Sequence, residues 1–317
     1  MKRSLFLSLL CLALAACGKQ QHVPQSESAT SGHFQLVADE VLKPAVDSLV
    51  AGFMQENPDV TISVKYTSAT EAVRELLNHQ ARAILIDRGL TPIERGILAK
   101  DSIQLPAFKL ALDGIGVLVS QKNPLDAIAK SDLVRIMSGK IANWSGLVRP
   151  IPDKANAGRK IAGEITVALP AYPSSIEFAL DSILLADSGT TAAHVLRFST
   201  SDSIIGYVRQ NPNAIGFISS AWYHELTASN DTSVKALPVE PADLSSEGLI
   251  EPVLLNMAYV AEGLYPLATP VTAYSFDVPD TPPRGFLAYA ATAHGQIVFK
   301  NFDVLPTTQP IRIVKSQ

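Results

Sequence analysis

The sequence contains only two cysteines, Cys11 and Cys17, and both lie within its first 17 residues. The rest of the chain has no thiol for a disulfide, so the packing of its core must hold it together. No apolar stretch beyond this region is long enough to span a bilayer as a helix. With 47% hydrophobic and 18% charged residues, the composition is that of a well-packed globular protein.

Signatures of the common enzyme classes are also absent. There is no G-x-S-x-G nucleophile elbow, H-E-x-x-H zinc helix, Walker-type phosphate loop or G-x-G-x-x-G turn after a strand. The six histidines are scattered without metal-ligand spacing. Ser188 and His194, six residues apart, indicate a loop and a helix surface rather than a hydrolase pair. We therefore predict that the protein is not an enzyme and uses no metal or other cofactor.

Positive charge is scarce as well. The formal net charge is -4, and removal of residues 1–16 would take away Lys2 and Arg3 but no acid, which makes it -6. A negative chain is a poor match for nucleic acid or for a surface of anionic lipid. We therefore expect no nucleic acid among its partners.

The N-terminus has the features of an export signal. Lys2 and Arg3 precede an apolar stretch over residues 5–16 that is too short to span a membrane as a mature helix. Leu14-Ala15-Ala16-Cys17 resembles the bacterial lipobox, in which cleavage before the cysteine is followed by its acylation. The alternative is an ordinary signal peptide with an incidental cysteine. We predict a signal peptide over residues 1–16, a lipid on Cys17 and a flexible tether over residues 17–32.

Strand and helix patterns alternate after the tether. Predicted strands cover residues 33–38, 61–66 and 83–86, and helices cover residues 39–57 and begin after Ser68 and Thr91. Ser68-x-x-Glu71, Thr91-x-x-Glu94 and Ser174-x-x-Glu177 are capping-box patterns that mark helix starts. This order predicts an α/β fold with a mostly parallel sheet, and the ligand crevice of such a sheet lies at the carboxyl ends of its strands.

A second α/β set follows, and the chain then returns to the first. Its predicted elements are strands at 165–169 and 214–219 and helices at 132–137, 174–185, 190–197 and 202–210; the C-terminal part adds a strand at 271–276 and a helix at 284–299. The run from Lys109 to Ser120, which contains Gly114 and Gly116, is too long for one half-buried strand and indicates a crossing between domains. We predict two lobes joined by two crossings, with lobe 1 at 33–116 plus 261–317, lobe 2 at 117–260 and a cleft between them.

Six stretches, in order, resemble one protein family. They read DEVLKPAVDSLVAGFMQENPDVTISVKY, DRGLTPIE, LALDGIGVLVSQKNPL, LVRIMSGKIANW, STSDSIIGYVRQNPNAIGFIS and YPLATPV. They resemble the PstS-type family, the phosphate-binding components of bacterial ABC importers with the type II periplasmic-binding fold. The similarity runs from about Phe34 to Pro306. It implies a bilobed α/β protein in the periplasm or cell envelope, with ABC permease subunits as partners.

The loops that reach the ligand in that family differ here. Family members cradle a tetrahedral oxyanion with N–H groups and hydroxyls at helix N-termini of both lobes. The first loop is Ala38-Asp39-Glu40-Val41 here, the pair after the third strand is Asp87-Arg88, and residues 169–175 lack the family's arginine and glycine. The chain therefore resembles a divergent branch. The resemblance implies these ligand contacts: Asp39, Glu40, Ser68, Asp87, Arg88, Ser174, Ser175 and Ser201.

Charge at these positions leaves two alternatives open. Arg88 can supply the positive charge for the anion, and Asp87 can accept the proton of a monohydrogen oxyanion, or both can form structural ion pairs. Asp39 and Glu40 favour the helix dipole but place negative charge where the anion would lie. Ser174 is expected both to cap its helix and to contact the ligand.

The function expected from this sequence is that of a lipid-anchored, extracytoplasmic solute-binding protein of an ABC importer, with phosphate or a related oxyanion as ligand. The alternative is a non-transport envelope lipoprotein, a sensor or interaction module that kept the scaffold and lost the ligand.

Overall fold

The computed structural model describes residues 27–147, 151–152, 162–171, 173–186, 191, 193–241 and 251–308. The predicted signal peptide, the lipidation site at Cys17 and most of the predicted tether lie outside the described residues. They stay predictions.

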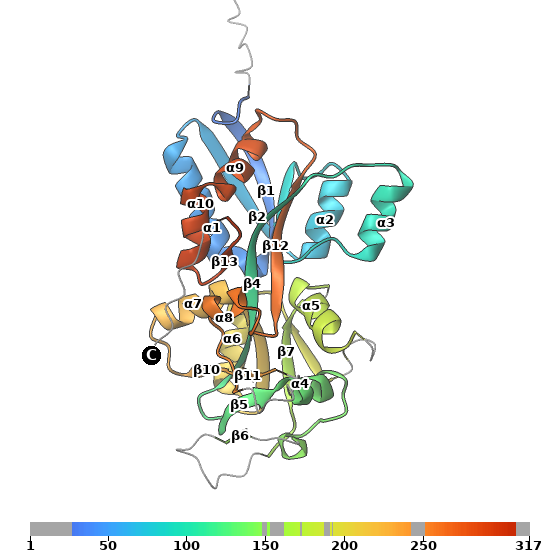
Figure 1. The fold of residues 1–317 in the computed structure, drawn as a ribbon, viewed down its shortest axis with the longest axis vertical. Coiled ribbons are helices and arrows are strands. Elements are labelled where there is room, and N and C mark those ends of the chain that lie inside the picture. The colour runs from blue at the N-terminus through green and yellow to red at the C-terminus, as the bar shows by residue number, and fades with distance from the viewer. Residues whose placement is uncertain are drawn as a thin grey trace, which may run out of the picture.

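The upper half of the molecule in Figure 1 is an α/β unit, called the first lobe here. The helices α1, α9 and α10 cover one face of its sheet, and α2 and α3 lie on the other side. Its strands are β1 (Gly32–Asp39), β2 (Val60–Thr67), β3 (Ala83–Ile86) and β12 (Ala268–Ser275), with the short β13 (Leu305–Pro306). Its helices are η1 (Glu40–Leu42), α1 (Lys43–Glu56), α2 (Ala69–Leu77), α3 (Pro92–Lys100), α9 (Pro282–Ala291) and α10 (Ala293–Asn301).

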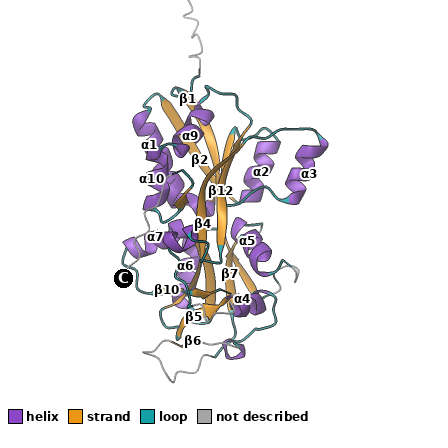
Figure 2. Cartoon of the chain, viewed as in Figure 1, coloured by secondary structure: helices purple, strands orange, loops and turns teal. Residues whose placement is uncertain are grey.

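The lower half, called the second lobe, is built in the same way (Figure 2). Its main strands are β7 (Thr166–Pro170), β8 (Val195–Phe198), β9 (Ala214–Ser219) and β10 (Val234–Leu237). A small separate sheet contains β5 (Leu125–Ala129), β6 (Ile151–Pro152) and β11 (Val239–Glu240). Its helices are α4 (Lys130–Met137), η2 (Trp144–Gly146), α5 (Ser175–Leu184), α6 (Ser201–Gln210), α7 (Ser220–Ala228) and α8 (Met257–Ala261).

One long strand, β4 (Ala107–Ser120), belongs to both lobes. Its first half pairs antiparallel with β12 as far as Gly114, and from Ile115 it pairs with β9. The result is one sheet of order β2-β1-β3-β12-β4-β9-β7-β8, in which β1, β2 and β3 are parallel, as are β7, β8 and β9. The predicted bilobed α/β fold is confirmed, while the residue boundaries predicted for the two lobes stay a prediction.

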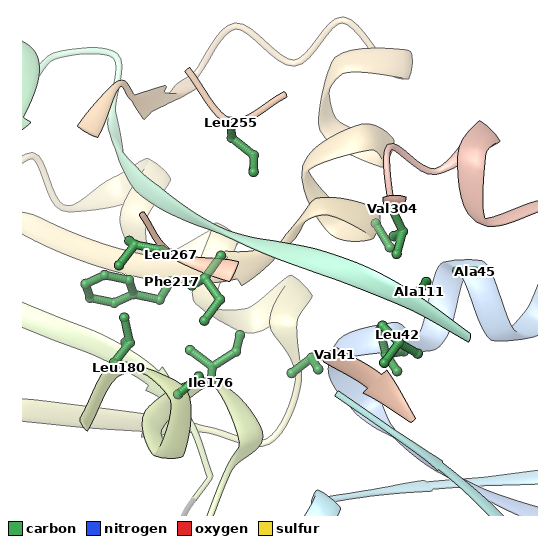
Figure 3. Packing of buried hydrophobic residues seen from close by; sticks show 14 of the residues in the cluster. Val41, Leu42, Ala45, Ala111, Ile176, Leu180, Phe217, Leu255, Leu267 and Val304 are labelled. Carbon is green, nitrogen blue, oxygen red and sulfur yellow. The ribbon is translucent and has the colours of Figure 1, made fainter. Parts of the chain in front are cut away.

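The buried core is continuous from one lobe to the other. Its largest cluster of buried apolar side chains contains Val41, Leu42 and Ala111 of the first lobe together with Ile176, Leu180 and Phe217 of the second. Figure 3 shows these side chains gathered along the strand that carries Ala111, with Leu255 on its other side. Apolar packing therefore extends along β4, where the lobes meet.

Two secondary-structure predictions were wrong. Residues 195–198 form the strand β8 rather than a helix, because Val195 to Phe198 pair in parallel with β7. The helix predicted over 284–299 is two helices, since the chain turns at Thr292. The Thr292 hydroxyl donates to the carbonyl of Tyr289 and accepts from the N–H of Gly295, so it ends α9 and caps α10.

Candidate functional site

A cavity of about 370 Å³ lies between the lobes. First-lobe residues from the ends of β1 and β2 line it, and second-lobe residues that end or follow β7 and β8 face them. The wall consists of Asp39, Glu40, Val41, Tyr66, Thr67, Ser68, Pro170, Ala171, Ser174, Ser199 and Thr200. The crevice is therefore at the carboxyl ends of parallel strands, as the α/β pattern predicts.

Three helices begin at this cavity. Ser68 caps α2 by accepting from the N–H of Glu71 at 3.3 Å, and Ser174 caps α5 by accepting from the N–H of Glu177 at 3.1 Å. The predicted helix starts at Ser68 and Ser174 are confirmed. Thr200 caps α6 by accepting from the N–H of Ser203 at 3.3 Å, so Ser201 is the first helical residue rather than the cap. Each helix directs the positive end of its dipole toward the cavity.

The first turns of α2 and α5 retain free donors. Within the described chain, no acceptor faces the backbone N–H of Ala69 or Thr70 in α2, or of Ser175 or Ile176 in α5. These are the groups that a helix leaves without an intrahelical partner. One such pair belongs to each lobe, so the cavity can offer backbone donors from two sides to an anionic group.

Glu40 occupies the corresponding position at α6. The backbone N–H of Ser201 donates to both Glu40 carboxylate oxygens at 3.0 Å, and the Ser201 hydroxyl donates to one of them at 2.8 Å. Burial raises the pKa of Glu40, and the bonds from Ser201 oppose that rise. A carboxylate of the first lobe therefore takes the place of an external anion at a helix N-terminus of the second.

Three carboxyl groups lie buried near one another at the level where β4 changes partners. Asp39 ends β1, Asp87 follows β3, and Asp113 lies in β4 opposite Thr269, whose hydroxyl donates to the carbonyl of Asp87. Burial raises the pKa of Asp39 to about 6 and that of Asp113 to about 7. Burial, and then the charges of Asp113 and Asp39, raise the pKa of Asp87 well above its ordinary value. These acids therefore retain protons more readily than exposed ones.

Several oxygens in this group have no hydrogen-bond partner among the described residues. They are Asp39 Oδ2, both carboxylate oxygens of Asp87, Asp113 Oδ2 and the hydroxyl oxygen of Ser175. The Ser175 hydroxyl nevertheless lies close enough to Asp39 to lower the pKa of that carboxyl. Buried polar atoms are normally satisfied, so these unpaired oxygens indicate either bound protons or a missing donor.

Arg88 is buried and donates its hydrogen bonds within the first lobe, and its guanidinium carbon lies 5.6 Å from the ring centre of Phe178 in α5 of the second lobe. Its guanidinium is 2% exposed and donates to both carboxylate oxygens of Glu94 at 2.7 Å, to the hydroxyl of Thr70 at 3.1 Å and to the carbonyl of Gly89 at 2.8 Å. It is not among the residues that line the cavity. Arg88 thus forms an ion pair with Glu94 rather than with Asp87, and a contact between Arg88 and the ligand stays a prediction.

The structure thus brings part of the predicted set together. Asp39, Glu40, Ser68 and Ser174 line the cavity, Ser175 and Ser201 adjoin it through Asp39 and Glu40, and Asp87 and Arg88 lie buried outside its wall. Sequence reasoning missed Tyr66, Thr67, Ser199 and Thr200 of the cavity wall and the buried Asp113. A signal existed for one of them, because Thr200 precedes a helical pattern at capping distance.

The described part of the chain shows neither a metal-binding cluster nor a membrane-spanning helix. It contains no group of three or more His, Cys, Asp or Glu side chains that could hold a metal ion. None of its helices combines the length and the apolar character needed to cross a membrane.

Comparison with known proteins places the chain in a family. A family model described as the PBP superfamily domain matches residues 23–294, so the chain belongs to this family. Two curated relatives, both named phosphate-binding protein PstS 2 and both from Streptococcus pneumoniae strains, are 28% identical over 114 residues. That match spans 36% of this chain and just over a third of the relatives' own length, 37%.

A longer match is to the phosphate-binding protein PstS of Bacillus subtilis. It is 24% identical over 277 residues and covers 84% of this chain and 81% of that protein. These relatives confirm the PstS-type resemblance found in the sequence.

Solved structures agree with this fold. A putative phosphate ABC transporter substrate-binding protein from Clostridium perfringens aligns with a TM-score of 0.71 at 19% identity, over 87% of this chain and 100% of that one. An ABC-type phosphate transport receptor from Vibrio cholerae aligns with a TM-score of 0.60 at 21% identity, again over 87% and 100%. At these identities the likeness shows the fold alone.

Proposed function

We propose that this chain is an extracytoplasmic solute-binding protein of an ABC importer, and that its interlobe cavity binds phosphate or a related oxyanion group. The observation that carries the proposal is the cavity itself, onto which α2 of one lobe and α5 of the other open with free backbone donors. Such donors bind an anion without a cationic side chain. Hydroxyls of Ser68, Ser174 and Ser199 add further hydrogen bonds.

The partners and the location that we propose rest on the family and on the N-terminal sequence. The relatives are named for phosphate binding, and permease subunits of an importer are the partners we propose here. Acylation of Cys17 would tether the protein to a membrane in the periplasm or cell envelope. A Cys17→Ser chain should then lose its membrane association, and unchanged fractionation would argue against the anchor.

Ligand binding can be tested by thermal shift and calorimetry with phosphate, sulfate and molybdate. A ligand at one hundred times its dissociation constant stabilises the folded state by about 2.7 kcal/mol, which is an easily measured shift. We expect phosphate to raise the melting temperature. If none of the three anions changes the melting temperature or gives a heat of binding, the oxyanion proposal fails.

One observation favours a second candidate. Glu40 already fills the N-terminus of α6, and Arg88 already pairs with Glu94, so two groups suited to an anion are satisfied internally. A non-transport envelope lipoprotein, acting as a sensor or interaction module on this scaffold, would have such a cleft. That candidate gains support if every small anion fails to bind while the chain still fractionates with the membrane.

A further inference from the structure

The wall of the interlobe cavity has an unbalanced charge. Its eleven residues include two carboxylates, Asp39 and Glu40, and no Lys, Arg or His. Glu40 is bound by Ser201, but Asp39 keeps an unpaired carboxylate oxygen among the described residues although the side chain is 2% exposed. A buried carboxylate oxygen without a donor is costly, so Asp39 Oδ2 favours a further partner that donates a hydrogen bond.

The neighbouring groups meet this need only in part. The Ser175 hydroxyl and the backbone N–H groups of Asp87 and Val41 lower the pKa of Asp39, but Asp39 Oδ2 keeps no hydrogen-bond partner among the described residues. The hydroxyl oxygen of Ser175 also has no hydrogen-bond partner among the described residues, and the guanidinium of Arg88 pairs with Glu94. Within the described chain no cluster of ligands could hold a metal ion beside Asp39. A cationic or hydrogen-bond-donating group of the solute itself therefore fits this position best.

The size of the cavity also suits an organic solute. Its volume of about 370 Å³ falls within the range of roughly 300–1,000 Å³ that is usual for organic ligands. The free N–H groups of α2 and α5 suit an anionic group, and Asp39 suits a positive one. The cavity thus offers complementary partners for two opposite charges on one small molecule.

We infer that the ligand is a small organic zwitterion that carries a protonated amine close to its oxyanion group. The oxyanion binds the first turns of α2 and α5, and the amine binds Asp39 with the Ser175 hydroxyl beside it. This inference rests on the proposed function, since it specifies the ligand of the same cavity. It distinguishes this chain from a protein that binds an inorganic anion.

Calorimetry of the purified chain with matched compounds tests the inference. The pair is 2-aminoethylphosphonate and ethylphosphonate, which differ only in the amine, with inorganic phosphate and ethylamine as the separate halves. We expect 2-aminoethylphosphonate to bind at least tenfold more tightly than ethylphosphonate or phosphate. Asp39→Asn should abolish this preference and leave ethylphosphonate binding unchanged or stronger. Asp59→Asn, an exposed change at the opposite end of β2, should keep the preference.

The other outcomes separate this inference from the proposed function. If ethylphosphonate or phosphate binds as tightly as 2-aminoethylphosphonate, the inference is overturned and oxyanion binding still stands. Binding of ethylamine as tight as that of 2-aminoethylphosphonate would also overturn it, because the oxyanion would then contribute nothing. If no compound binds, both proposals fail. Should Asp39→Asn not fold, as judged by circular dichroism, the wild-type comparison of the two phosphonates decides alone.

Discussion

Ser174 performs two tasks that a matched pair of variants can separate. It caps α5 through the N–H of Glu177, and it lines the interlobe cavity. Ser174→Ala should lower the free energy of unfolding by about 1 kcal/mol, because a cap is lost. It should also weaken binding of the tightest anion severalfold, because a hydroxyl is lost from the wall. Chemical denaturation and calorimetry measure the two effects.

Thr91 provides the control for Ser174. It caps α3 through the N–H of Glu94 at 3.2 Å and does not line the cavity. Thr91→Ala should therefore cost a similar amount of stability and leave anion affinity unchanged. If both variants weaken binding equally, the contribution of Ser174 to affinity comes from stability alone.

Asp113 should make stability depend on pH. Its pKa lies near 7 in the folded protein against an ordinary value of 3.8, first because it is buried and further because of the charge of Asp39. The folded state therefore binds the proton more tightly, and the stabilisation from that proton is lost as the pH rises from about 4 to 7. Asp113→Asn removes the titration and retains an oxygen for the N–H groups of Gly114 and Ser220. Its stability relative to wild type should rise over this range by a few kcal/mol, at about 1.4 kcal/mol per pKa unit.

Denaturation at several pH values checks the prediction for Asp113. Asp231 is the control, because its pKa is shifted in the opposite direction. Hydrogen bonds from Ser233 and the neighbouring Arg209 lower the pKa of Asp231 to about 2. Its stabilisation is present above pH 3.8 and lost as the pH falls toward 2, so Asp231→Asn should show no trend between pH 4 and 7. A difference between Asp113→Asn and wild type that does not change with pH would contradict the assignment.

Among the elements, the helix starts that are marked by short local patterns were predicted well from the sequence. The capping patterns at Ser68, Thr91 and Ser174 depend on residues three apart, and all three cap their helices. The strand β8 was missed because its conformation depends on pairing with β7, about 30 residues earlier in the chain. The break at Thr292 was missed because its neighbours on both sides favour helix.

The difference between local patterns and contacts made only in the fold also explains which site residues could be predicted. The carboxyl ends of parallel strands indicate where the cavity lies, so Asp39, Ser68 and Ser174 could be placed together. The ion-pair partner of Arg88 could not be predicted, because the sequence identified Glu94 only as the acidic member of a capping box. Its carboxylate accepts from the N–H of Thr91 and from Arg88 at once, which only the folded loop reveals.

Gly114 marks the point on β4 where the strand changes partners, and it can be tested for close packing. A Cβ there would lie 2.3 Å from Leu255 Cδ1, so Gly114→Ala must displace Leu255 and should destabilise the protein by about 1–3 kcal/mol. The double variant with Leu255→Ala should show a coupling that recovers part of this loss. Denaturant titration gives the values.

Gly206→Ala is the control, because a Cβ in that part of α6 meets nothing within 4 Å, and it should be neutral or stabilising. Equal effects at the two glycines would refute the packing argument.

At the scale of the whole molecule, the short helix η1 ties the first lobe to three parts of the second. The Ser219 hydroxyl, at the end of β9, donates to the carbonyl of Val41 at 2.6 Å, and the indole N–H of Trp222 in α7 donates to the carbonyl of Glu40 at 3.4 Å. The Glu40 carboxylate is bound by Ser201 at the start of α6. Because these contacts need no ligand, the lobes can remain closed in its absence. The charge of Glu40 also lies in the wall of the cavity that an anion would enter.

Two substitutions of Glu40 test both consequences. Glu40→Ala removes the contact with α6, so the ligand-free protein should open and its radius of gyration, measured by small-angle scattering, should increase. Glu40→Gln keeps an oxygen for the Ser201 N–H but removes the charge, so the protein should stay closed and bind phosphate or ethylphosphonate severalfold more tightly in calorimetry. Glu225→Gln, an exposed change on α7, should alter neither property. If Glu40→Ala leaves the dimensions unchanged and Glu40→Gln leaves anion affinity unchanged, Glu40 neither holds the lobes together nor opposes anion binding through its charge.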